Sequence, residues 1–485
     1  MNADRRDDGG PPAPLLYIGG AWREGRAATV TVIRNPATGL ALAELSHASA
    51  EDLGEALVSV ERGFALWRRT PAAERANVLE RAANLLAARV ESVARLITLE
   101  QGKPLAEARA EVMGTVQTLK YSGAQATRIT GRILPSAEPG AQWEIQPQPV
   151  GPCAMFSPWN MPLILAARKV GPALAAGCAA ILKPSEEAPS AVAVMVECLR
   201  QAGLPADVLN LVYGVPSEVS ATLIASPVIR KISLTGSVAV GRLIAGLAAP
   251  QFQRVTLELG GHAPVIVLDD VDVPAVALQC AAAKYRNAGQ LCLAPTRFLI
   301  QSAVYERFVA CFVAAAQRLK VGDGLRPDVD MGPLANERQL RSIEARVAAA
   351  VAEGATLLAG GAQVGDAGYF YAPTVLADLT PAMRILLDEP FGPVALMCRV
   401  ASLDDALLQA NRNSLGLAGY AFTHSAPAQR RIQCELEVGS LAVNNVRVSC
   451  AEAPFGGVKD SGIGYEGGDE GLDAYLTMRT THRLA

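Results

Sequence analysis

Apolar and polar residues follow two different patterns along the chain. Over residues 50–120 the apolar residues recur every three or four positions, which places them on one face of an α-helix. From about residue 150, short apolar runs typical of buried strands alternate with longer stretches typical of helices. The predicted strands lie in GPCAMFS (151–157), AAILKPS (179–185), VLNLVYG (208–214), RKISLTG (230–236) and RVTLELG (254–260). This alternation predicts parallel strands joined by right-handed crossovers.

A second series of strands and helices begins near residue 264 with PVIVLDD and predicts another α/β domain. Residues 126–149 interrupt the first domain, and their alternating pattern around a Pro-Gly turn predicts a projecting hairpin. Together with a last strand-like stretch near 474–485, this hairpin could pair with another subunit. Residues 1–14 are predicted to be a flexible tail.

The composition narrows the class of protein. The 485 residues exceed one ordinary core and indicate two or three domains. Half of the residues are hydrophobic and 19% are charged, which argues against general disorder. The net charge of −3 argues against nucleic acid or an acidic membrane surface as the main partner. No apolar run reaches the roughly 18 residues of a membrane span without an interrupting charge, glycine or proline.

The cysteines indicate the compartment. Nine cysteines are scattered along the chain, and no CxxC pair is present, so zinc-binding and thioredoxin-type motifs are excluded. No apolar segment follows Arg5 and Arg6, and Asp7 and Asp8 argue against a transit peptide. We therefore predict a reduced, cytoplasmic protein.

One of these cysteines, Cys292, stands in a segment suited to catalysis. It follows a predicted helix-to-loop transition in YRNAGQLCLAP, where asparagine and glycine let the backbone turn and present a side chain to a cleft. Taken alone, such a cysteine is more often a small buried hydrophobe. A catalytic thiol also needs a base and a site that stabilises an oxyanion.

Two other segments offer those groups. Glu258 stands near the end of the apolar run VTLEL, which two glycines follow, and desolvation there would raise its pKa toward that of a general base near neutral pH. The alternative is a salt-bridged glutamate at a strand end. Asn160 in FSPWNMP carries an amide that can donate to a developing oxyanion, and the alternative is a turn asparagine between prolines.

Seven motifs, in this order, resemble those of the aldehyde dehydrogenase superfamily. They are PWNMP, KPSEEAP, LTGSVAVG, LELGG, NAGQLC, EPFGPV and APFGGVKDSGIG, and the resemblance runs from LYIGGAW (16–22) to EGLDAYL (470–476). It implies an α/β fold with two Rossmann-like domains and a protruding β oligomerisation arm, in a homodimer or homotetramer. The implied division is a NAD-binding domain at 15–125 and 150–257, the arm at 126–149 and 468–485, and a catalytic domain at 258–467.

The resemblance also implies catalytic roles. The Cys292 thiol attacks the aldehyde carbon, and the Asn160 side chain with the Cys292 backbone N–H holds the oxyanion of the thiohemiacetal. Hydride transfer leaves a thioester, which water activated by Glu258 hydrolyses. Lys169 and Glu466 match positions linked to proton relay and to support of the site.

The implied cofactor is NAD, with NADP possible. No GxGxxG fingerprint occurs in the implied NAD-binding domain, and the matching turn runs from Gly236 and Ser237 to Gly241, a spacing that an ordinary tight turn also has. Glu186 matches a carboxylate that binds the ribose hydroxyls, so a 2′-phosphate beside it would meet roughly 4 kcal/mol of repulsion, which Lys183 and Ser185 offset in part. The other implied cofactor contacts are Trp159 with Ser237 at the pyrophosphate, Lys183 at the adenosine ribose, and Glu389 with Phe391 at the nicotinamide ribose.

Within the family, the chain is most similar to the succinate-semialdehyde dehydrogenase branch. The members of that branch bind the distal carboxylate of the substrate with two arginines and a serine, which match Arg168, Arg286 and Ser449 here. Two buried guanidiniums in a tunnel are costly unless an anion arrives, and charged hydrogen bonds to it contribute roughly 1.5–3 kcal/mol each. The alternative is that one arginine pairs with an acidic residue of the protein.

Some positions depart from the family pattern, and they leave the substrate open. Met161 and His262 replace commoner residues, while Arg447 adds a charge to the substrate loop, where Cys450 is also present. Succinate, glutarate and 2-oxoglutarate semialdehydes all fit. A CoA-dependent enzyme would lack Glu258, and a non-catalytic member would lose one of the three catalytic groups. Neutral aldehydes remain the main alternative substrate.

Overall fold

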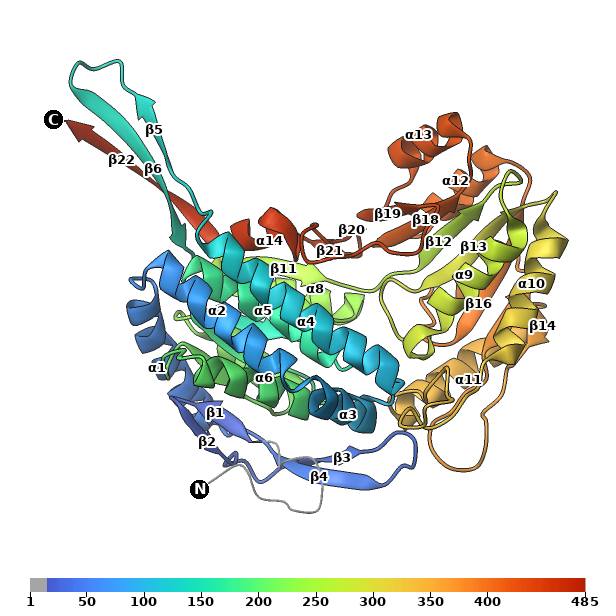
Figure 1. The fold of residues 1–485 in the computed structure, drawn as a ribbon, viewed down its shortest axis with the longest axis horizontal. Helices are drawn as coiled ribbons and strands as arrows, with labels where there is room; N and C mark the ends of the chain where they lie inside the picture. Colours follow the sequence, from blue (N-terminus) through green and yellow to red (C-terminus); the bar gives the residue numbers. More distant parts are fainter. Residues whose placement is uncertain (1–14, 485) are drawn as a thin grey trace.

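The computed structural model describes residues 15–484, so the tail predicted at 1–14 lies outside the described residues. The first domain is built on an eight-stranded sheet with the order β2-β1-β9-β8-β7-β10-β11-β21 (Figure 1). The five central strands, β9, β8, β7, β10 and β11, are parallel, as their sequences predict. The strands are β1 (Leu16–Ile18), β2 (Ala21–Arg23), β7 (Cys153–Phe156), β8 (Ala180–Lys183), β9 (Leu209–Leu211), β10 (Lys231–Thr235), β11 (Arg254–Glu258) and β21 (Gly462–Ile463).

Helices cover this sheet because their apolar faces meet its buried strands. In Figure 1, α5 and α6 lie over the sheet and contact its strands, while α2 and α4 pack on these two helices, with α4 against both α2 and α5. The helices of this domain are α1 (Ala50–Trp67), α2 (Ala72–Ala87), α3 (Val90–Gln101), α4 (Leu105–Ala126), α5 (Pro162–Ala176), α6 (Ser190–Gln201), α7 (Pro216–Ala225) and α8 (Val238–Ala248). A separate hairpin joins β3 (Val30–Arg34) to β4 (Ala41–Ser46).

The second domain has its own seven-stranded sheet, with the order β14-β15-β16-β13-β12-β18-β19. All neighbouring strands are parallel except β14 and β15. The strands are β12 (Ala263–Val267), β13 (Pro295–Gln301), β14 (Thr356–Ala359), β15 (Thr374–Ala377), β16 (Val394–Val400), β18 (Ala418–Phe422) and β19 (Ser440–Val443). The helices are α9 (Val273–Tyr285), α10 (Tyr305–Arg318), α11 (Glu337–Ala352), α12 (Leu403–Asn411) and α13 (Ala426–Glu435). The short strands β17 (Leu415–Gly416) and β20 (Val458–Lys459) pair with each other.

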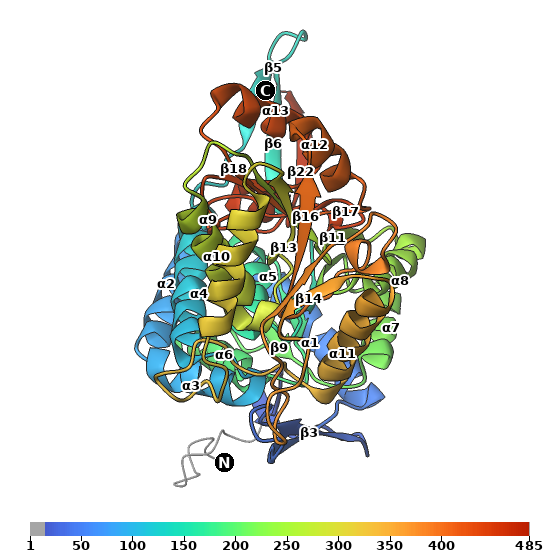
Figure 2. The same cartoon turned by 90° about the vertical axis from the view of Figure 1, so that its right-hand side faces the viewer.

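A three-stranded arm projects from the first domain in both views (Figures 1 and 2). Its strands are β5 (Arg132–Pro135), β6 (Ala141–Pro149) and β22 (Leu476–Leu484), with β6 in the centre. Trp143 stacks on His482 with 4.1 Å between ring centroids, which ties the hairpin to the C-terminal strand. The helix before this strand, α14 (Gly468–Asp473), packs on α4 and α5 rather than in the arm. The predicted α/β class with two domains and a protruding β arm is confirmed.

One short strand late in the chain lies in the sheet of the first domain. Strand β21, at residues 462–463, pairs with β11 in the sheet of the first domain, although β18 and β19 before it belong to the sheet of the second. The domain boundaries drawn from the sequence therefore remain predictions. Within residues 15–484, none of the helices combines the length and the apolar character that a bilayer span requires.

Candidate active site

The predicted catalytic groups come from the carboxyl edge of the first sheet and from a loop of the second domain. Asn160 follows β7, and Glu258 is the last residue of β11. Cys292 lies between α9 and β13, in a loop that reaches back to this edge. A Cβ on Gly261 would stand 2.2 Å from the carbonyl oxygen of Cys292. Glycine is therefore required for the close approach of the turn after Glu258 to the cysteine loop.

Glu258 is 1% exposed, and neither of its carboxylate oxygens has a hydrogen-bond partner among residues 15–484. Burial raises the pKa of Glu258 to about 7, and repulsion from Glu466 acts in the same direction. The neighbouring Cys292 thiol, Lys169 and Arg168 oppose the increase. A carboxyl group with a pKa near 7 can accept and release a proton at neutral pH, as a general base must.

Cys292 is half-buried as a residue. Burial of the thiol raises its pKa well above 9, and the Glu258 and Glu389 carboxylates add to this effect. Arg168 acts in the opposite direction. The thiol is therefore protonated at neutral pH, and its nucleophilic form requires a nearby base. Glu258 is a neighbouring group with a suitable pKa.

Asn160 is 4% exposed and anchored by its own amide. Its Nδ2 donates to the carbonyl oxygen of Gln290 at 3.0 Å, two residues before Cys292 in the chain. A carboxamide nitrogen carries two hydrogens, and this bond uses one of them. The second has no acceptor within residues 15–484.

Lys169 and Glu466 form a buried ion pair at the same edge of the sheet. Lys169 Nζ also donates to Thr235 Oγ1 at 2.6 Å, and Thr235 is the direct parallel neighbour of Glu258. The Oε2 atom of Glu466 has no hydrogen-bond partner in the described chain. The pair lies close enough to Glu258 for both of its charges to act on the Glu258 pKa.

Arg168 and Ser449 are brought together as predicted, whereas Arg286 differs from the prediction. Arg168 is 9% exposed, and its Nη2 donates to Ser449 Oγ at 2.5 Å. Its guanidinium lies 5.6 Å from the ring centroid of Phe455. Arg286 is exposed at the end of α9, where its charge opposes the increase that burial causes in the pKa of Glu107. The expectation of two buried guanidiniums is therefore wrong for Arg286, because the helix ends there and its side chain reaches solvent.

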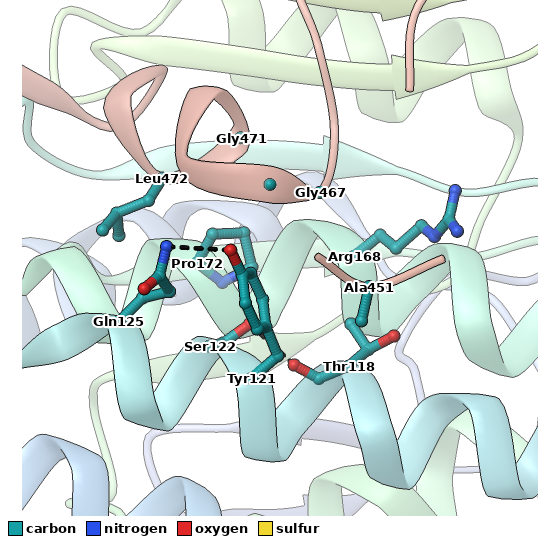
Figure 3. Close-up of a pocket in the computed structure, with 11 residues that line it drawn as sticks. Thr118, Tyr121, Ser122, Gln125, Arg168, Pro172, Ala451, Gly467, Gly471 and Leu472 are labelled. Carbon is teal, nitrogen blue, oxygen red and sulfur yellow. Dashed lines mark hydrogen bonds between the residues drawn. The ribbon is translucent and has the colours of Figure 1, made fainter. Parts of the chain in front are cut away.

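The cavity behind Arg168 is too small to hold a substrate. Figure 3 shows Arg168 extending from α5, away from Tyr121 and Gln125, which line the other side. The cavity measures about 20 Å³, enough for one water molecule. Two of the residues that line it, Tyr121 and Gln125, donate hydrogen bonds to Asp469. An anion bound by Arg168 must therefore approach from the other side of the guanidinium.

The predicted cofactor residues gather around the start of α8 and the edge of the first sheet. Ser237 is exposed and caps α8, where it accepts from Val240 N at 3.4 Å, while Gly236 N donates to Glu258 O at 3.0 Å. Trp159 and Phe391 meet edge to face, with 5.7 Å between ring centroids. The first-turn N–H groups of such a helix have no partners within the helix and suit a phosphate group.

The other predicted cofactor residues have defined neighbours. Lys183 Nζ lies 2.5 Å from Glu186 Oε1, and the same oxygen accepts from Gly214 N at 3.1 Å. Ser185 Oγ accepts from the N–H of residue 187 in a local turn. A Cβ on Gly260 would be 2.6 Å from Glu389 Oε2, and one on Gly241 would be 2.5 Å from the Leu259 side chain. Both glycines are therefore required for close packing.

A set of polar residues that the sequence analysis missed surrounds the catalytic loops. Gln101, Lys103, Glu107 and Glu111 stand where α3 meets α4, and their side chains bond to the loops of Asn160 and Asn287. The available signal was the segment EQGKPLAEARAE, in which polar residues recur on the face that a helix would bury. Lys103 and Glu111 are 1% and 2% exposed, which the helical pattern alone does not indicate.

The pKa of Glu258 has a consequence for stability. Its folded-state pKa of about 7 exceeds the ordinary 4.5, so the unfolded chain releases the proton first, and stability falls as pH rises from about 4.5 to 7. The shift corresponds to about 3 kcal/mol. We expect Glu258→Gln to raise the free energy of unfolding by about that amount at pH 8 and to change it little near pH 4. Urea unfolding at both pH values measures this, and an equal effect at both would contradict it.

Comparison with known proteins finds relatives that match nearly the whole length of the chain. A model described as the aldehyde dehydrogenase family matches residues 22–481. The chain is 51% identical to a 4-(hydroxymethyl)benzenesulfonate dehydrogenase from Comamonas testosteroni, over 97% of this chain and 98% of the relative. It is 41% identical to the mitochondrial succinate-semialdehyde dehydrogenase of Arabidopsis thaliana, over 95% and 88%. The crystal structure of a Burkholderia pseudomallei succinate-semialdehyde dehydrogenase matches with a TM-score of 0.96 at 37% identity, covering 99% of this chain and 100% of that one.

Proposed function

Because the chain belongs to the aldehyde dehydrogenase family, we propose that it oxidises an acidic semialdehyde, of the succinate-semialdehyde kind, to the dicarboxylate. Family membership makes it an oxidoreductase that uses NAD or NADP. The nature of the substrate, the preferred cofactor and the roles of individual residues are the parts proposed here.

The proposed chemistry uses the three groups at the edge of the first sheet. Glu258 takes the proton of the Cys292 thiol, and the thiolate attacks the aldehyde carbon. The oxyanion that forms accepts hydrogen bonds from Asn160 Nδ2 and from the backbone N–H of Cys292. A bound nicotinamide supplies the acceptor for the hydride that leaves this carbon. Glu258 loses this proton to solvent and then removes a proton from water, which attacks the thioester carbonyl and releases the acid and the Cys292 thiolate. Lys169 and Glu466 are proposed to relay the proton to solvent.

The residues around α8 fit a nicotinamide dinucleotide. The exposed helix N-terminus at Ser237 suits the pyrophosphate, and the pair of Trp159 and Phe391 offers apolar walls. Lys183 and Glu186 would hold the adenosine ribose. Glu389 would hold the nicotinamide ribose, and because Glu389 lies against Gly260, that ribose would lie next to the strand that carries Glu258.

The observation that carries the choice of an acidic substrate is the environment of Arg168. Its guanidinium is buried, and the one hydrogen bond that it donates within residues 15–484 goes to Ser449 and not to an acidic group. Its Nε is also buried without a hydrogen-bond acceptor there. A buried cation with a missing acceptor is costly, and a substrate anion would supply the acceptor. Ser449, already bonded to Arg168, would add a hydroxyl donor to the same anion.

A second candidate substrate is an aromatic aldehyde that carries a sulfonate. The relative from Comamonas testosteroni, at 51% identity, is named for a benzenesulfonate. A sulfonate is also a singly charged oxyanion, so Arg168 could bind it as it would bind a carboxylate. Both candidates share a distal anion and differ in what lies between the anion and the aldehyde.

Matched pairs of aldehydes test the proposal. We expect kcat/KM for succinate semialdehyde to exceed that for butanal by about a hundredfold, which corresponds to two charged hydrogen bonds. The second pair is 4-formylbenzenesulfonate and benzaldehyde. A preference for the anion in either pair supports the distal anion, and the larger preference identifies the skeleton. Equal values within both pairs would exclude an anion-binding function of Arg168.

Cofactor preference forms a separate prediction. We propose a preference for NAD, because the Glu186 carboxylate, 2.5 Å from Lys183 Nζ, would repel a 2′-phosphate and keeps the lysine charge paired. Glu186→Ala is expected to raise kcat/KM for NADP at least about tenfold relative to NAD. Glu187→Ala is the matched control, since Glu187 bonds instead to Arg338. An unchanged ratio in Glu186→Ala would contradict the proposed contact.

We also propose that the chain forms a homodimer or homotetramer in the cytoplasm. The arm exposes the large apolar side chains Ile133 and Leu134 on its edge strand β5 and Met478 on β22, which a second copy of the chain would cover. All nine cysteines are free, in agreement with a reducing compartment.

A further inference from the structure

The corner between α3 and α4 inserts a buried charge into the loop that carries Asn160. Lys103 is 1% exposed and lies 2.6 Å from Glu111 Oε2, so the two form a buried ion pair. The remaining donors of Lys103 reach the carbonyl oxygen of Asn160 at 2.8 Å and Met161 Sδ at 3.0 Å. Every N–H of this ammonium group is therefore directed at Glu111 or at the loop after β7.

Glu111 fixes the same loop from its other end. Its Oε1 accepts from the backbone N–H groups of Leu163 at 2.9 Å and Ile164 at 3.4 Å, in the first turn of α5. The Glu111 carboxylate thus binds the start of α5, and Lys103 binds Asn160 and Met161 just before that helix. Asn160 is held between them, in a loop whose backbone is neither helix nor strand.

The carbonyl of Asn160 has a second donor, which connects it to the cysteine loop. Asn287 Nδ2 donates to this oxygen at 2.9 Å, and its Oδ1 accepts from Gln101 at 2.8 Å. The backbone N–H of Asn287 donates to Glu107 Oε2 at 2.9 Å. Asn287 has a φ of 49°, an unfavourable backbone conformation for a non-glycine residue. These bonds hold it there, five residues before the nucleophile.

We propose that Lys103, held by Glu111, is a positioning residue that fixes the Asn160 amide relative to the Cys292 loop. This inference rests on the proposed role of Asn160 as the oxyanion donor. A donor stabilises the transition state only when it lies within hydrogen-bond distance of the place where the charge develops, and small displacements are costly. Lys103 contacts only protein groups here, so its effect on the reaction is exerted through the main chain of Asn160.

The test removes the ion pair as a unit. The variant Lys103→Met/Glu111→Gln leaves no unpaired buried charge, and the amide oxygen introduced at position 111 can still accept from the first turn of α5. We expect the first-turnover rate of hydride transfer, followed as NADH formation in a stopped-flow instrument, to fall by about 10- to 100-fold. The KM values for the aldehyde and for NAD should change less than about threefold, because the contact acts mainly in the transition state.

A double-mutant cycle with Asn160→Ala separates positioning from a general structural effect. If Lys103 acts through Asn160, adding the double substitution to Asn160→Ala should slow hydride transfer by less than about threefold more. An undiminished further loss in that background, or a wild-type rate in Lys103→Met/Glu111→Gln, would overturn the inference. If Asn160→Ala alone kept the wild-type rate, the proposed chemistry would fail instead, so the two failures are distinguishable.

Two further variants show whether a slower reaction reflects a general loss of folded structure. Arg75→Met removes another buried cation of the first domain, whose donors go to the carbonyls of Ala175 and Thr70, and it should leave hydride transfer unchanged. Glu111→Gln alone keeps the lysine and its bond to Asn160, so it should slow the reaction less than the double variant. Equal losses in Arg75→Met and the double variant would overturn the positioning role.

Discussion

Replacing Cys292 with alanine is expected to lower the rate of NADH formation by at least about 10⁴-fold, because the sulfur forms the covalent intermediate that the other groups serve. The Cys292 loop lies against the turn that follows Glu258. The remaining thiols that are not buried, Cys311, Cys434 and Cys450, belong to other segments. Steady-state assays with saturating aldehyde and NAD measure the loss.

The exposed Cys434, on α13, provides the control for this substitution. Cys434→Ala should retain full activity, since its side chain is remote from the edge of the first sheet. Thermal unfolding should be similar for both variants. Residual activity above about one per cent in Cys292→Ala would contradict the covalent mechanism.

Replacing Arg168 with methionine should change substrate preference more than any other substitution. The guanidinium is buried and lacks an acceptor for Nε, so a substrate anion is expected to gain two or more charged hydrogen bonds there. Losing them corresponds to about a 10²- to 10³-fold fall in kcat/KM for the acidic aldehyde. The neutral aldehyde of equal length should lose less than about threefold, and the ratio of the two values is the measurement.

Arg286→Ala is expected to have a smaller effect on substrate preference than Arg168→Met. Its side chain is exposed and lies near Glu107, so solvent and this carboxylate already satisfy much of its charge. It should reduce the preference for the acidic aldehyde several-fold less than Arg168→Met does. An equal fall for acidic and neutral aldehydes in Arg168→Met would mean that Arg168 supports the fold and does not bind the substrate.

The sequence allowed the main elements of the fold to be predicted because their causes are local. Buried parallel strands such as β7 and β8 are uninterrupted apolar runs, which the alternation with helices makes recognisable. The arm was predictable from the alternating pattern around its turn at Gly140. The pairing of β21 with β11 was not, because two residues carry no periodic signal.

The sequence allowed the catalytic residues of the candidate site to be predicted, but not the burial and the hydrogen-bond partners of the residues around them. Glu258 and Cys292 stand in motifs that indicate a general base and a nucleophile. The exposure of Arg286 depends on where α9 ends, which a motif does not specify. The bond from Lys103 to Asn160 joins residues 57 positions apart, and that from Gln101 to Asn287 spans 186, so only the folded chain reveals them.

Trapping the acylated enzyme tests the central claim most directly. Wild-type protein is mixed with succinate semialdehyde and NAD, quenched in acid during the first turnover and digested, and each cysteine peptide is examined by mass spectrometry. A succinyl group on the peptide of Cys292, appearing together with the first equivalent of NADH, is the predicted result. NADH formed without any acyl group on Cys292, or with the group on another cysteine, would contradict the account.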